Sequence, residues 1–208
     1  MNNQVDPKIA DWLNEKASFY NNPTFVDSDP ISIPHMFSNK EDIEVAALFS
    51  SLIAWGNRKA IVAGAQQLMK RMDNAPFQFI IEHNQKDLKN LNGFVYRTFN
   101  SFDAITLCEG LKNIYLHAGG LQSVFSKPLR NRINSNAFDA IEHFRKIILQ
   151  YPHEKRFEKH ISSPERGSAA KRLNMFLRWM VRRDNNGVDF GLWTDSFQMK
   201  KLLIPLDV

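Results

Sequence analysis

Apolar residues recur every three or four positions along most of this chain, which is the spacing of one face of an α-helix. Phe94–Arg97 is the only extended segment that the pattern predicts, and residues 24–40 and 127–136 read as connecting loops. The predicted fold class is therefore all-α, with residues 1–208 forming one compact domain of one or two helical lobes. Helices are expected at about 6–20, 41–56, 57–69, 76–83, 85–91, 101–118, 121–126, 136–150 and 168–183.

The helix expected at 41–56 differs from the others because it is apolar on nearly every face. Such a pattern predicts a central helix that is buried on all sides. Glu41 and Asp42 fall in its first turn, where negative charge is favoured by the helix dipole. The helix expected at 168–183 instead carries a buried stripe, with Lys171, Arg178 and Arg182 together on another face.

Composition narrows the range of functions. The formal net charge of +5 favours a polyanionic partner such as nucleic acid. A single cysteine, Cys108, excludes a disulfide framework and a cysteine-ligated cluster, and the scattered histidines indicate no metal site. No Walker-type or dinucleotide-binding motif is present, so no cofactor is expected. No signal peptide precedes the first helix, and no apolar run is long enough to span a membrane. We therefore expect a cytoplasmic protein with no membrane partner.

Candidate chemistry lies near the end of the sequence. Gly167 and Ser168 form a turn before a helix, and the unpartnered N–H groups of a first helical turn can hold a phosphate. Lys171 stands just inside that turn beside Arg172, where the positive helix end favours the neutral amine. A neutral lysine can attack a sugar carbon and form a Schiff base. The alternative is a solvated lysine on a basic helix.

Two segments resemble a known superfamily. Gly167–Asn174 resembles the helix-hairpin-helix signature of endonuclease III and 8-oxoguanine glycosylase, with Ala169 in place of the second glycine. Ile204–Asp207 resembles that superfamily's Val/Ile-Pro-Val-Asp segment, and the 36 residues from Lys171 to Asp207 are nearer the archaeal 8-oxoguanine glycosylase pattern. The chain is also similar to a bacterial family of uncharacterised conserved hypothetical proteins. Because superfamily members continue into further helices, we expect the C-terminal helices of this fold to be missing.

The resemblance implies a two-lobed fold and a base-excision DNA glycosylase with AP-lyase activity that acts on damaged duplex DNA without a cofactor. Lys171 would be the nucleophile at the mouth of a cleft, with the carboxylate of Asp207 close by. Trp55 would wedge into the base stack, or else belong to the core. The alternative function is a non-catalytic nucleic-acid-binding helical protein. The expected DNA contacts are Gly167, Ser168, Ala169, Arg172, Trp55, Arg58 and Lys59.

Overall fold

The computed structural model describes residues 6–130 and 134–205, and these residues form an all-α fold as predicted. Short 3-10 turns and one two-stranded antiparallel hairpin, β1 (Val95–Tyr96) with β2 (Phe99–Asn100), join the helices. The α-helices are α1 (Pro7–Tyr20), α2 (Pro23–Val26), α3 (Lys40–Ile53), α4 (Arg58–Arg71), α5 (Pro76–Glu82), α6 (Ser101–His117), α7 (Gly120–Arg130), α8 (Ala137–Ile148) and α9 (Lys171–Val181). The 3-10 turns cover Pro30–Ser32, Pro34–Met36, Asp87–Leu91, Lys155–His160, Pro164–Arg166 and Met199–Lys201.

Several local predictions need correction. Residues 24–26, expected in a connecting loop, belong to α2. The helix expected at 85–91 is a 3-10 turn. The extended segment after Phe94 has a partner strand that the sequence did not indicate, because the reversal uses Arg97 at φ +53° rather than an Asn-Gly pair. The loop predicted from 127 is wrong up to Arg130, because α7 continues through Pro128. Proline removes one helical hydrogen bond, and the burial of Leu129 on the apolar face of α7 favours continuation.

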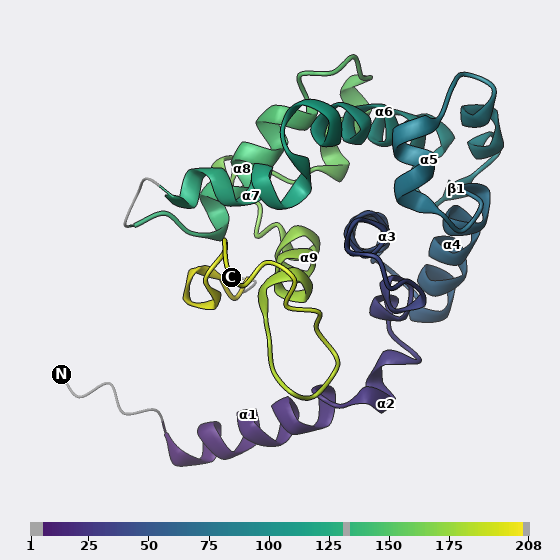
Figure 1. Cartoon of the computed structure of the whole chain (residues 1–208). Helices are drawn as coiled ribbons and strands as arrows, with labels where there is room; N and C mark the ends of the chain where they lie inside the picture. The colour runs from purple at the N-terminus through teal and green to yellow at the C-terminus, as the bar shows by residue number, and fades with distance from the viewer. Residues whose placement is uncertain (1–5, 131–133, 206–208) are drawn as a thin grey trace.

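Helices α3 and α9 lie side by side at the centre of the molecule (Figure 1). Residues 43–53 of α3 are all buried, which confirms the central buried helix predicted from its pattern. Helices α4 and α5 cover α3 on one side and α9 lies against the other, while α6, α7 and α8 pack together above them in the view of Figure 1. The buried apolar residues from Ile31 to Phe197 form one cluster, so segments from both ends of the sequence share the same core.

Two features of the core hold distant segments together. The Glu44 carboxylate of α3 accepts hydrogen bonds from Tyr115 Oη at 2.8 Å and Trp193 Nε1 at 2.7 Å. It thereby joins α3 to α6 and to the segment after α9. Gly110 allows α6 and α8 to approach closely, because a Cβ at this position would lie 2.4 Å from Ile148 Cδ1. The side chain of Ile148 occupies the space that a larger residue would need.

Helix α1 projects from the rest of the molecule (Figure 1) and contains no buried residue. Asp6 caps it by accepting a hydrogen bond from the Lys8 amide, as the Asp-Pro start predicts. Its large apolar residues, including Trp12 and Phe19, are exposed. Asn21, just after α1, donates to Asp184 at 2.9 Å and so connects this end of the chain to the loop after α9. No helix in the described residues is long and apolar enough to cross a bilayer.

Candidate active site

Helix α8 fixes the segment that leads into the predicted hairpin. Glu142 accepts hydrogen bonds from Ser163 Oγ at 2.5 Å and from the Glu165 amide at 2.8 Å. Arg145, three residues later on the same buried face, donates to the Glu158 carbonyl at 2.8 Å and pairs with the Glu158 carboxylate at 2.9 Å. These bonds satisfy two buried charged groups with backbone and side-chain partners. The charged stretch before the hairpin is therefore anchored at several points to α8.

The hairpin itself turns at Gly167. This residue has φ +81°, and a Cβ there would meet nothing within 4 Å, so the backbone conformation is what favours glycine. The Gly167 amide donates to the Pro164 carbonyl at 2.9 Å, and the Ser168 amide donates to the Ser163 carbonyl at 3.1 Å. Both amides are therefore used inside the turn. A phosphate at this hairpin would have to be held by Ala169 and by the first turn of α9.

Helix α9 begins at Lys171, three residues later than the predicted start at 168. Ala170 precedes it in a left-handed conformation, and no side chain caps the helix. Asn174 supports this start, because its Nδ2 donates to the carbonyls of Ala169 at 3.1 Å and Ala170 at 3.3 Å. The Oδ1 atom of Asn174 is buried and has no hydrogen-bond partner among the described residues. The N-terminus of α9 thus has no side-chain cap, its first residue Lys171 is exposed, and an unused acceptor lies in its first turn.

Lys171 is exposed and lines a cavity of about 390 Å³. The residues that line it from α9 recur at intervals of three and four, so one face of the helix forms this wall. Residues 202–205 form the other wall, so the cavity lies between α9 and the end of the chain. Asp207 lies outside the described residues and follows Pro205 by two positions. The cavity is lined by Lys171, Asn174, Met175, Arg178, Leu202, Leu203, Ile204 and Pro205.

Arg172 points away from this cavity and toward α3. Its guanidinium donates to the Leu52 carbonyl in the last turn of α3. Carbonyls in a last helical turn lack an intrahelical partner, and Arg172 supplies one. Burial lowers the pKa of Arg172 from its ordinary value. The residue predicted to contact DNA therefore connects the start of α9 to the end of α3.

Trp55 lies two residues beyond α3, in the same region. Its ring is half-buried, and the Arg97 guanidinium lies 5.0 Å from the ring centroid. The Trp55 carbonyl accepts a hydrogen bond from Tyr96 Oη at 2.9 Å, whereas its indole Nε1 is buried without a partner among the described residues. Gly56 lets the Arg97 side chain approach, because a Cβ there would lie 2.7 Å from Arg97 Nη2. Arg97 therefore covers part of the Trp55 ring, which would have to be exposed to insert between bases.

Arg58 and Lys59 occupy the first turn of α4, where Asn57 caps the helix by accepting from the Ala60 amide at 3.2 Å. Both side chains are exposed. Arg58 lies with its guanidinium carbon 5.4 Å from the Phe25 ring centroid and its Nε 3.9 Å from Asp29. The structure thus places these two residues on the surface, with Arg58 held against neighbouring side chains.

Sequence reasoning missed an ion-pair network next to the cavity. Arg178 Nε lies 3.2 and 3.3 Å from the two carboxylate oxygens of Asp189. Arg182 Nη1 lies 3.4 Å from the same carboxylate, and Arg182 Nη2 lies 2.8 Å from Asp184. Burial raises the pKa of Asp189, and the two arginines partly oppose that rise. The shared face of Lys171, Arg178 and Arg182 was visible in the sequence, whereas Asp189, which pairs with the two arginines, lies in a segment without periodicity.

The fold and this site define an all-α protein in which a lysine at the start of a helix lines a cavity. The chain belongs to the family described as "Protein of unknown function (DUF2400)", whose family model matches residues 29–208. Helices α1 and α2 precede the matched region. No curated protein and no solved structure matches the chain.

Proposed function

We propose that this protein is a cytoplasmic base-excision DNA glycosylase with AP-lyase activity, in a two-lobed helix-hairpin-helix fold. One observation carries the proposal. Lys171 is the first residue of α9, directly after Ala170 in its left-handed backbone conformation, and its side chain lines a cavity. The opposite wall is the segment that leads to Asp207. A cavity that presents an amine to a substrate is what covalent attack on a sugar requires.

In the proposed reaction, duplex DNA binds and the damaged nucleotide turns out of the helix into the cavity. The amine of Lys171, once it has lost its proton, attacks C1′ of the sugar as the glycosidic C–N bond breaks. The base departs with that electron pair and is protonated by water, and Asp207 accepts the proton that the amine loses. As the sugar ring opens, the C1′–O4′ electron pair goes to O4′, which takes the proton from Asp207, and a C1′=N Schiff base remains. Loss of a C2′ proton then allows the C3′–O bond to break, which nicks the strand.

The proposed DNA contacts surround the cavity. Ala169 and the uncapped first turn of α9 would hold a phosphate of the strand beside the exposed Gly167–Ser168 turn, whose own amides are used within the turn. Arg58 and Lys59 would add positive charge at the start of α4. Trp55 would reach the base stack after Arg97 moves from its ring. Arg172 would act by holding α9 against α3 rather than by contacting phosphate directly.

A non-catalytic nucleic-acid-binding protein is the second candidate. The uncapped start of α9, where Lys171 is exposed, favours it, because peptide N–H groups at a helix start bind phosphate whether or not a nucleophile is present. This candidate predicts DNA or RNA binding that weakens with salt and involves no covalent step. The two candidates therefore differ in whether a covalent adduct forms with DNA.

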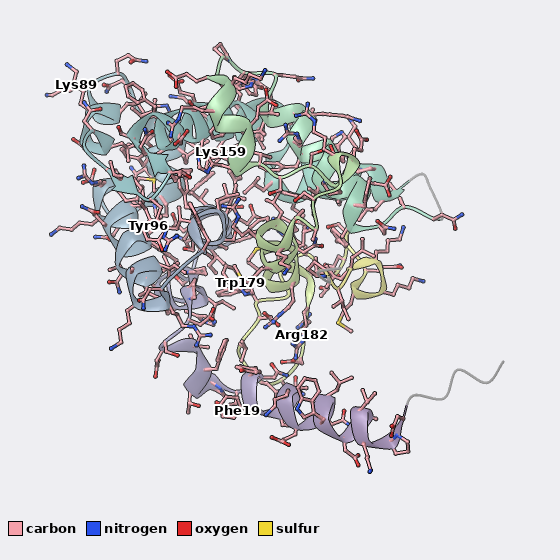
Figure 2. All side chains as sticks on the ribbon, turned by 180° about the vertical axis from the view of Figure 1, so that it is seen from behind. Phe19, Lys89, Tyr96, Lys159, Trp179 and Arg182 are labelled. Carbon is pink, nitrogen blue, oxygen red and sulfur yellow. The ribbon has the colours of Figure 1, made fainter. Side chains whose placement is uncertain are left out.

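Borohydride trapping on duplex DNA with abasic or oxidised sites separates the two functions. We expect the 208-residue protein to form a reduced covalent adduct that Lys171→Ala abolishes. Lys89→Ala is the matched control, because Lys89 is exposed and lies at the far edge of the molecule (Figure 2). Equal adduct yields from Lys171→Ala and Lys89→Ala would mean that surface lysines react nonspecifically. That result, or no adduct from the unaltered protein, would reject the glycosylase proposal.

A further inference from the structure

Arg178 is held in a defined orientation at the cavity by a buried carboxylate. The Asp189 side chain is completely buried and binds Arg178 only through Nε. Within residues 6–130 and 134–205, no acceptor is hydrogen-bonded to Nη1 or Nη2 of Arg178. The side chain is 41% exposed and lines the same cavity as Lys171. The outer fork of the guanidinium therefore faces a space that a ligand can enter.

The chemistry of this arrangement fits an oxyanion. A guanidinium presents paired N–H groups in a fixed plane, which match two oxygens of a phosphate or carboxylate. Anchoring at Nε reduces the side-chain freedom that binding would otherwise remove. Asp189 also pairs with Arg182, and the carboxylate of Asp29 interacts electrostatically with Arg178. These carboxylates balance the local positive charge. The affinity and selectivity for an oxyanion would therefore come from the hydrogen-bond geometry at Nη1 and Nη2 of Arg178.

Lys171 and Arg178 are seven residues apart on one helix face, which separates them by about 10 Å along the axis. Met175 lies between them on that face, and Leu203 and Ile204 line the opposite wall. The cavity thus has a cation at each end of an apolar middle. A nucleotide has the corresponding parts, because its sugar and base are flanked by phosphates along the strand.

We propose that Arg178, positioned by Asp189, binds a backbone phosphate next to the nucleotide that reacts with Lys171. This subsite rests on the proposed function, since it assumes that a DNA strand enters the cavity. It identifies the recognised substrate as a strand that continues past the damaged nucleotide, rather than a free base or nucleoside. Arg178 then contributes to binding while Lys171 carries the chemistry.

The test measures equilibrium binding to a duplex that contains a tetrahydrofuran abasic analogue, which cannot form a Schiff base. Arg178→Gln is expected to lower affinity about tenfold, as loss of a charged hydrogen bond predicts. Arg178→Lys should recover only part of the loss, because an ammonium lacks the planar fork. The control Lys89→Gln removes one charge at the far edge of the molecule (Figure 2) and should leave affinity unchanged.

A second measurement separates loss of this one contact from a general loss of DNA binding. Each phosphate within two nucleotides of the analogue is replaced in turn by an uncharged methylphosphonate. One replacement should weaken binding by the unaltered protein about tenfold and have no effect on Arg178→Gln, which shows that the two groups interact. If no single replacement weakens binding, or if it weakens both proteins equally, the subsite is refuted.

The outcomes separate this inference from the proposed function. Trapping through Lys171 without coupling at Arg178 would retain the glycosylase and reject the phosphate subsite. Coupling at Arg178 without trapping would retain the subsite and favour the non-catalytic candidate. Absence of all DNA binding at low salt would reject the subsite directly.

Discussion

Replacing Arg172 tests whether this residue acts in the fold or at a DNA surface. Its guanidinium donates to the Leu52 carbonyl at the end of α3, and α3 and α9 form the centre of the molecule. Arg172→Met keeps much of the side-chain length and removes the donor. The Leu52 carbonyl then loses its charged partner between two packed helices. We therefore expect Arg172→Met to be less stable than the unaltered protein even in the absence of DNA.

The expected magnitude follows from that single bond. A hydrogen bond to a charged group contributes about 1.5–3 kcal/mol, so we expect a loss of about 2 kcal/mol in the free energy of unfolding. For a chain of this length each kcal/mol shifts Tm by about 2–4 °C, which gives a decrease of about 4–8 °C. Thermal unfolding followed by far-UV circular dichroism measures this decrease.

Arg166→Met is the matched control. Arg166 also pairs with a single partner, Glu158 at 3.3 Å, but its side chain is 73% exposed. Exposed ion pairs contribute about 0–1 kcal/mol, so this control should shift Tm by no more than about 4 °C. Equal Tm shifts for the two variants, or a normal Tm for Arg172→Met together with weakened DNA binding, would refute the role of Arg172 as a link between helices.

The remaining predictions concern buried charges and close packing. Burial raises the pKa of Glu44 above its ordinary 4.5, although Trp193 and Tyr115 oppose the rise. Because the folded state holds this proton more tightly than the unfolded state, the free energy of unfolding should fall as pH rises from below 4.5 through the raised pKa. In urea unfolding at a series of pH values, Glu44→Gln should not show this fall. Burial alone would raise the pKa of Asp103, but interactions with His160, the Asn100 amide and Arg156 lower it overall below 3.8. Asp103→Asn should lower the free energy of unfolding by about 3 kcal/mol at neutral pH. This loss should shrink as pH falls through 3.8 and then through the lowered pKa of Asp103, as urea unfolding at a series of pH values would show. A loss that did not change with pH would contradict the lowered pKa. Gly110→Val should cost about 1–3 kcal/mol by forcing Ile148 from its place between α6 and α8, whereas the double variant with Ile148→Ala should recover part of that cost.

Hydrophobic periodicity determined the main helices. It identified α3 as a central helix, because apolar residues on every face leave no side to expose. It also identified the buried stripe of α9, including Leu173, Phe176, Leu177 and Met180. These features depend on residues within one or two helical turns of each other, which is the range over which a sequence pattern carries information. Turn signals were weaker, as the Arg97 hairpin and the continuation of α7 through Pro128 illustrate.

Only the tertiary structure decided what each charged side chain does. Arg172 and Lys171 are neighbours in sequence, yet one bonds the end of α3 and the other lines the cavity. Arg178 acquires its orientation from Asp189, and Arg97 lies over Trp55 after a chain reversal. Such contacts join segments whose approach is set by the packing of α3, α8 and α9 in the core. Because a long polar side chain can adopt many directions from the same backbone, its partner depends on that packing and not on the local sequence.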